Sequence, residues 1–169
     1  GKPRHFNIKQ IVKIEQEREI GSVTGRNIMG YIEGTDKKNE ILILTAHYDH
    51  IGMRGKDVFN GADDNASGSS TLTQIARAFQ VAKNSGKGPR RSVLCLLLTG
   101  EEKGLLGSMY YVGNPRFPLE QTIADINMDM VGRIDEKYKP NGKYIYVIGS
   151  DRLSSELHLV NEKVNNDYS

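Results

Sequence analysis

Four short segments of the chain are rich in side chains that bind metal ions. They read HYDH at residues 47–50, GADDNASG at 61–68, GEE at 100–102 and NMD at 127–129. A histidine combined with several carboxylates suits zinc, manganese or cobalt, whereas calcium sites use only oxygen ligands and thiolate zinc sites need cysteine. These residue types therefore favour metal-assisted hydrolysis, with zinc as the first choice of metal.

The number of acidic groups favours more than one metal ion. If the segments meet at one place, like charges repel each other unless cations are bound there. The residues that would meet are His47, Asp49, Asp63, Asp64, Glu101, Glu102 and Asp129. These residues are more than one ion needs as ligands. They fit two ions that lie about 3.5–4 Å apart and share one carboxylate. Adjacent side chains point in different directions, so one of the two glutamates at 101–102 can bind metal while the other takes a proton from the attacking water.

Each segment taken alone has a simpler interpretation. A single aspartate at the end of a strand is commonly a turn former or a helix cap. A plain α/β domain with acidic loops would need four independent coincidences, three of them at the ends of strands. We therefore favour a metal site.

Apolar runs and their spacing predict the elements that carry these segments. Residues 41–50 and 92–99 are strongly apolar and end in polar residues, as strands buried on both faces do at the edge of a sheet. We expect strands over residues 12–20, 27–32, 41–50, 92–99, 122–131 and 143–148. We expect helices over residues 67–83, 105–112 and 154–165, a turn over 34–39, and a loop over 52–64.

The alternation of strands and helices predicts an α/β fold, namely a three-layer α/β/α sandwich around a mostly parallel sheet. In such folds ligands bind beyond the carboxyl ends of the strands. Three of the four acidic segments stand at such ends, and the fourth lies in the loop after the first.

The composition is that of an ordinary globular domain. The 169 residues include 23 Lys and Arg against 21 Asp and Glu, a net charge of +2 that is too small to indicate a nucleic-acid partner. A short basic run at 83–91 has no aromatic residues for stacking and is expected to be a solvated loop. The longest clean apolar run, 93–98, is far too short to span a membrane. The first residues do not have the pattern of a secretory leader, so we expect that a leader is either absent or already removed. Cys95 lies inside that run and is expected to be a buried hydrophobe.

Taken in order, the segments HYDH at 47–50, GADDNASG at 61–68, TGEEKGLLGS at 99–108 and NMDMVG at 127–132 resemble those of the di-zinc aminopeptidases. This is metallopeptidase family 28, which contains bacterial leucyl aminopeptidase, glutamate carboxypeptidase and the glutaminyl cyclases. The resemblance covers residues 24–169 and implies a zinc-exopeptidase-like fold with a mixed sheet. It implies that 24–169 are roughly the N-terminal two-thirds of a catalytic domain, with 1–23 as a lead-in strand or linker.

The resemblance also assigns metal ligands. It implies that His47 and Asp129 bind the first metal ion, that Asp64 bridges both ions, and that Glu102 binds the second. Two zinc ions are expected in a complete domain.

Two further residues receive catalytic roles by the same resemblance. Glu101 is expected to be the general base, and Asp49 to hold the imidazole of His47 in the correct tautomer. The peptide bond between Asp64 and Asn65 is expected to be cis, and Asp63 is expected to be a neighbour of the site without binding metal.

The remaining histidines are weaker candidates. Relatives complete the second metal site with a histidine far beyond the segment of Asp129, and we expect that part to be missing, so that this chain alone binds fewer ions and is inactive. His158 lies in a predicted helix and is expected to have a surface or packing role. His50 is a secondary candidate for lining the pocket, and His5 is expected in a mobile terminus.

The expected function is that of a zinc-dependent exopeptidase, with aminopeptidase activity favoured, that hydrolyses a terminal bond of a peptide substrate. The alternatives are a glutaminyl cyclase-like enzyme with a single zinc ion and a non-catalytic receptor-like module of the same fold. No nucleic-acid partner and no membrane span are expected. The resemblance favours a secreted, periplasmic or envelope-associated protein.

Overall fold

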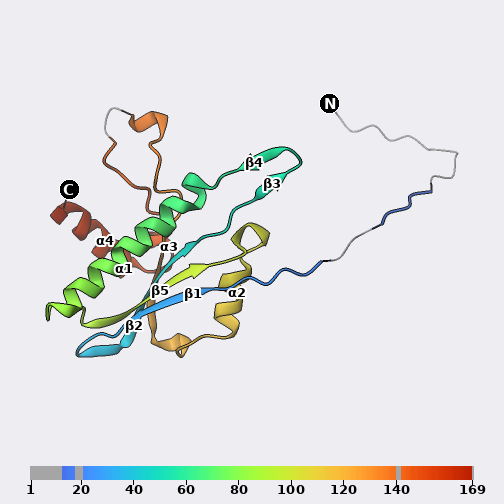
Figure 1. Ribbon diagram of the computed structural model, residues 1–169. Coiled ribbons are helices and arrows are strands. Elements are labelled where there is room, and N and C mark those ends of the chain that lie inside the picture. Colours follow the sequence, from blue (N-terminus) through green and yellow to red (C-terminus); the bar gives the residue numbers. More distant parts are fainter. Residues whose placement is uncertain (1–12, 18–20, 140–141, 169) are drawn as a thin grey trace.

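A four-stranded mixed sheet forms the centre of the computed structural model, which describes residues 13–17, 21–139 and 142–168 (Figure 1). The strands are β1 (Ile28–Ile32), β2 (Lys37–His47), β5 (Arg91–Leu98) and β6 (Thr122–Asn127), in the order β1-β5-β2-β6. The strand β2 pairs in parallel with both β5 and β6, whereas β1 runs antiparallel to β5. The predicted mostly parallel sheet is confirmed.

One helix packs on each face of this sheet. The helix α1 (Gly68–Asn84) covers one face and α2 (Leu106–Gly113) the other (Figure 1). Because side chains alternate along a strand, Leu44 and Cys95 pack towards Leu72 of α1, while Ile43 and Leu96 pack towards Tyr111 of α2. The predicted three-layer α/β/α arrangement is therefore present.

Shorter elements connect these layers. A hairpin of β3 (Gly52–Arg54) and β4 (Asp57–Phe59) follows β2, and the irregular turn η1 (Ala62–Ser67) leads into α1. Single turns occur at η2 (Glu101–Lys103), η3 (Leu119–Gln121) and η4 (Glu136–Tyr138). The chain ends with α3 (Ser150–Leu153) and α4 (Ser155–Tyr168).

Several sequence-based expectations are wrong in detail. No strand forms over residues 143–148, where Ile148 is 91% exposed, because this apolar segment pairs with no other strand among the described residues. The predicted strand at 12–20 is absent over its described part, 13–17, and its other residues lie outside the described ranges. The expected loop at 52–64 contains the β3–β4 hairpin, since glycines at 52 and 55 adopt the positive φ angles that a tight connection needs.

The boundaries of two predicted segments also shift. The strand β6 ends at Asn127, four residues before the expected end, and the polar residues that follow it are free to form the site. The strand β2 begins at Lys37, inside the expected turn.

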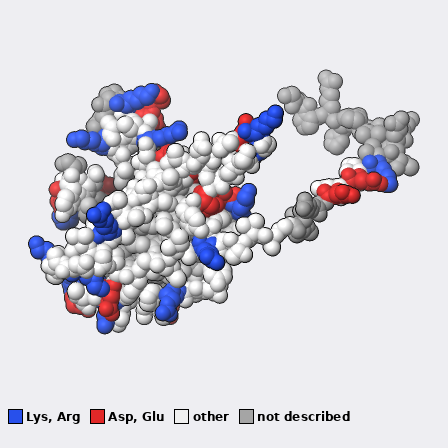
Figure 2. Space-filling view, viewed as in Figure 1, with Lys and Arg blue, Asp and Glu red and all other residues white. Residues whose placement is uncertain are grey.

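The charged surface is mixed. On the face that Figure 2 shows, Lys and Arg side chains are scattered among Asp and Glu, and they form no continuous basic area over the described residues. In the part of the chain that the structure describes, no helix combines the length and apolar character needed to cross a bilayer.

Candidate metal centre

The parallel pairing of β2 with β5 and β6 brings three of the acidic segments to one edge of the sheet. His47, the last residue of β2, pairs with Leu98 of β5, and Thr45 pairs with Asn127, the last residue of β6. The segments that follow Leu98 and Asn127 therefore leave the sheet beside His47. This is the carboxyl edge, where α/β folds bind their ligands.

His47, Asp64 and Asp129 form a first group of candidate ligands. The Nε2 atom of His47 lies 3.1 Å from Oδ1 of Asp64 and 3.6 Å from Oδ2 of Asp129. The side chain of His47 is only 3% exposed, whereas the two carboxylates remain accessible. One nitrogen and two oxygen atoms within 4.8 Å of one another can surround a single ion.

His50, Asp64 and Glu102 form a second group. The Nδ1 atom of His50 lies 2.7 Å from Oε1 of Glu102 and 3.9 Å from Oδ1 of Asp64. Asp64 thus belongs to both groups, which is the position that the resemblance assigns to it. His50 had been expected at most to line the pocket, and the repeated histidine in HYDH is the sequence signal for its place in this group.

The buried side chain of Asn65 fixes the loop that carries Asp64. Its Nδ2 donates to the carbonyl of Met128 at 3.0 Å, and its Oδ1 accepts from the backbone N–H groups of Gly68 at 3.0 Å and Met130 at 3.3 Å. A Cβ atom on Gly68 would come within 2.2 Å of the carbonyl oxygen of Met128, so only glycine fits there. The peptide bond between Asp64 and Asn65 is cis, which confirms that prediction.

Asp49 connects the end of β2 to the segment after β5. Its carboxylate accepts the backbone N–H groups of Glu101 at 3.1 Å and Glu102 at 3.4 Å. The closest contact of Asp49 with the imidazole is through its carbonyl oxygen, 3.1 Å from Nδ1 of His47, while its carboxylate lies 3.8 Å away. Asp49 therefore orients both neighbouring segments, and its backbone holds the imidazole more closely than its side chain does.

Glu101 faces the same site. Partial burial raises the pKa of its carboxyl group, the charge of His47 opposes this shift, and the carboxylates of Glu102, Asp129 and Asp49 add to it. A carboxyl group with a raised pKa is better suited to accept and later release a proton near neutral pH.

Asp63 and His158 lie apart from both groups. The carboxylate of Asp63 accepts the N–H of Gly132 at 2.9 Å and lies 3.6 Å from Nε of Arg133. His158 lies on α4, with Nδ1 3.2 Å from Oγ of Ser150. His5 lies outside the described residues, and Cys95 is buried in the core, where burial raises the pKa of its thiol.

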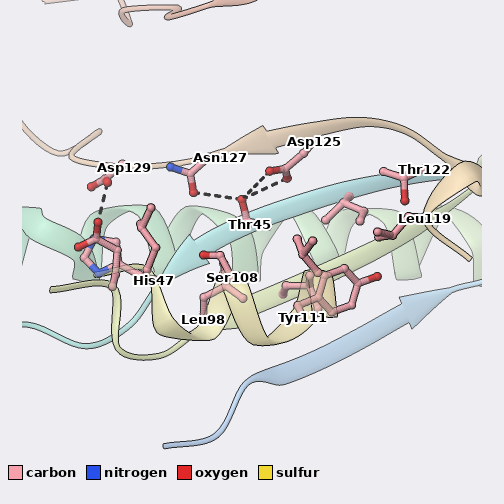
Figure 3. A pocket seen from close by; sticks show the side chains of 15 residues that line it. Thr45, His47, Leu98, Ser108, Tyr111, Leu119, Thr122, Asp125, Asn127 and Asp129 are labelled. Carbon is pink, nitrogen blue, oxygen red and sulfur yellow. Dashed lines mark hydrogen bonds and ion pairs between the residues drawn. The ribbon is translucent and has the colours of Figure 1, made fainter. Parts of the chain in front are cut away.

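A pocket of about 300 Å³ adjoins the first group of ligands. His47 and Asp129 lie at one end of it, and Thr45 links Asp125 and Asn127 by hydrogen bonds along its wall (Figure 3). Glu101 also lines the pocket. Its apolar lining comes from Ile43, Leu96, Leu98, Leu105, Tyr111 and Val112. Loss of hydration raises the pKa of Asp125, and the hydrogen bond from Thr45 partly opposes this effect.

Comparisons with known proteins show the family to which the chain belongs. Residues 27–168 match the model of peptidase family M28. The chain is 30% identical over 141 residues to Aminopeptidase YwaD of Bacillus subtilis, covering 79% of this chain and 29% of that protein. It is 33% identical over 105 residues to a probable glutamate carboxypeptidase VP8 of Zea mays, covering 62% of this chain and 14% of that protein.

A solved structure supports the same relationship. The zinc aminopeptidase from Bacillus subtilis superposes with a TM-score of 0.56 at 30% identity, covering 82% of this chain and 32% of that one. The chain thus spans about a third or less of the length of these relatives. Because the family model matches residues 27–168, the chain belongs to peptidase family M28.

Proposed function

We propose that this chain carries the catalytic metal site of a zinc-dependent exopeptidase. The observation that carries the proposal is the convergence of His47, Asp64 and Asp129 beside the pocket that Glu101 lines. A catalytic zinc site has three protein ligands and leaves a further position for water or substrate, and this group offers three. The similarity to the zinc aminopeptidase from Bacillus subtilis supports zinc as the metal.

The donor atoms of the site fit zinc. Imidazole nitrogen and carboxylate oxygen are ordinary zinc ligands, and the chain's single cysteine is buried in the core away from the site. His47, Asp64 and Asp129 would hold the first ion, and Asp64 and Glu102 the second. When bound, zinc lowers the pKa of a water molecule and polarises the carbonyl of the scissile bond.

Glu101 performs the proton transfers in this proposal. Its carboxylate takes a proton from the attacking water and delivers it to the nitrogen of the leaving amine. Its raised pKa favours this second step, because a protonated carboxyl group is then accessible closer to neutral pH. Asp49 positions Glu101 by accepting its backbone N–H.

Of the two exopeptidase activities we favour that of an aminopeptidase, because the chain is similar to Aminopeptidase YwaD over 79% of its residues.

A glutaminyl cyclase-like enzyme with one zinc ion is the second candidate. The presence of two ligand groups that share Asp64 favours two ions instead. A non-catalytic module is disfavoured, because a domain that has no catalytic role has no need for Glu101 beside a complete ligand group.

The whole protein should be assayed with leucine p-nitroanilide, with its N-acetylated form, and with N-blocked peptides that have a free carboxyl terminus. We expect hydrolysis of the unblocked anilide alone. The Glu101→Gln variant should keep its zinc and lose about 10²- to 10⁴-fold in kcat. Glu162→Gln makes the same change on the exposed surface of α4 and should keep full activity.

Three outcomes would change the proposal. Cleavage only of N-blocked peptides would identify a carboxypeptidase. Cyclisation of glutaminyl peptides with one zinc ion per protein would identify the cyclase. Normal turnover in Glu101→Gln would refute its role as general base.

A further inference from the structure

The β3–β4 hairpin leaves the chain between two parts of the metal centre. His50 precedes it, and the turn that carries Asp64 follows it. Gly61, at the start of that turn, has a φ of +66°, and a Cβ atom there would lie 2.9 Å from Cβ of His50, so the base of the hairpin packs directly against this histidine. Figure 1 shows the hairpin projecting beyond the end of β2. The hairpin therefore stands at the rim of the site.

One face of the hairpin carries an aromatic ring and a guanidinium group. Gly52 pairs with Phe59 and Arg54 pairs with Asp57, so Phe59 and Arg54 lie on the same face. The ring of Phe59 meets the imidazole of His50, with ring centroids 6.5 Å apart. The Cζ atom of Arg54 lies 5.8 Å from the centroid of the same ring. His50, Phe59 and Arg54 thus form a row that runs from the metal centre out along the hairpin.

Arg54 has no carboxylate partner among the residues that the structure describes. Asp57 stands directly opposite it in the hairpin, yet no ion pair joins the two side chains. The side chain of Arg54 is exposed, and its one described contact is the stacking on Phe59. A guanidinium that stacks on a ring still presents N–H donors at its edge, in a planar fork that matches a carboxylate. Arg54 is therefore available to the carboxylate of a ligand.

The spacing along the hairpin fits an extended peptide. Arg54 is two residues from Gly52, the partner of Phe59, and two residues of extended chain span about 7 Å. A peptide that follows the hairpin outward from the metal centre would place its first leaving residue beside Phe59 and the carboxylate of its second at Arg54. The ring of Phe59 is 36% exposed and can cover the apolar atoms of such a peptide.

We propose that the β3–β4 hairpin binds the leaving part of the substrate, with Phe59 packing against it and Arg54 pairing with its free carboxyl terminus. This inference rests on the proposed function, which places the scissile bond at the metal centre. It names a substrate class, namely tripeptides with a free carboxyl terminus. Arg54 then determines specificity and takes no part in the chemical step, because it contacts the peptide away from the scissile bond.

The test compares a tripeptide with its carboxyl-terminal amide. The whole protein is assayed with Leu-Gly-Gly and with Leu-Gly-Gly amide, and the release of leucine is measured. We expect kcat/KM to be about three- to tenfold higher for the free acid, because an exposed pair of arginine and carboxylate contributes modestly. Arg54→Gln should bring this ratio close to one by raising KM for the free acid. The matched control Lys56→Gln removes a positive charge from the turn of the same hairpin and should keep the ratio.

The outcomes separate this inference from the proposed function. Equal kcat/KM values for the two peptides in the unmodified protein would overturn the inference, and this comparison needs no variant. A ratio that survives Arg54→Gln, or that falls equally in Lys56→Gln, would also overturn it. Each of these results leaves the peptidase proposal standing, because leucine is still released. Release of leucine from neither peptide would contradict both.

Discussion

The two ends of β2 use carboxylates in opposite ways. At the amino end, Asp36 receives hydrogen bonds from Arg90 at 2.6 and 3.0 Å, and Glu40 receives one from Arg91 at 2.6 Å. At the carboxyl end, Asp64, Glu102 and Asp129 have only histidine partners among the described residues. Acidic charge that the chain balances itself stabilises the fold. Carboxylates that lie together without a Lys or Arg partner indicate where a cation is expected.

Variants at the two ends of β2 should differ most in how zinc changes their thermal stability. A ligand that binds only the folded state stabilises it by about 2.7 kcal/mol at a concentration of 100 times its Kd. We expect zinc to raise the thermal midpoint of the chain by several degrees. Asp64→Asn, which removes the shared carboxylate, should abolish that shift.

The control for this experiment is Asp36→Asn at the other end of the strand, which should keep the zinc response unchanged. If zinc stabilises Asp64→Asn as much as it stabilises the unmodified chain, the ion binds elsewhere. The two ends of β2 would then not differ as described.

A smaller effect is expected when Asp49 is changed. Its carboxylate accepts two backbone N–H groups and carries none of the proposed metal bonds, so Asp49→Asn should loosen the segment of Glu101 and Glu102 without removing a ligand. We expect zinc affinity, measured by competition with a chromophoric chelator, to fall by about 10- to 100-fold. An affinity equal to that of the unmodified chain would show that this support is dispensable.

The smallest effect is expected at the amino end, in acid. The hydrogen bonds from Arg90 hold the pKa of Asp36 at about 2, below its ordinary value of 3.8. Because the pKa is lower in the folded state, the pair contributes stability above pH 3.8, and this contribution is lost as the pH falls through about 2.

Urea unfolding of the unmodified chain and of Asp36→Asn should therefore differ slightly at neutral pH and converge near pH 2. The effect is small because both side chains are exposed to solvent. A difference that persists unchanged below pH 2 would contradict the assigned ion pair.

The central sheet could be predicted because its strands are long apolar runs that end abruptly in polar residues. This pattern located β2 and β5 and placed His47 and Glu101 at the edge. The segment at 143–148 has similar residues but forms no strand, because apolar character does not supply a neighbouring strand. The β3–β4 hairpin was missed because its strands have only three residues each, too few for a visible alternation.

The second histidine of HYDH marked His50 as a candidate, but the residue that it meets could not be predicted from the spacing alone. Its contact with Glu102 joins the segment after β2 to the segment after β5, and this depends on the pairing of His47 with Leu98. The sequence shows which residues follow each strand, but the register between strands determines which of them meet. For the same reason Asp49 was expected to act on His47 through its carboxylate, whereas that carboxylate accepts N–H groups at the end of the neighbouring strand.

The most direct test of the metal centre is zinc K-edge X-ray absorption of the zinc-loaded whole protein. We predict a shell of nitrogen and oxygen atoms alone at about 2.0–2.2 Å, with the scattering pattern of imidazole. We also predict a zinc–zinc distance of about 3.5–4 Å. A sulfur ligand at about 2.3 Å, or a shell without imidazole, would place the ion away from His47 and contradict the account.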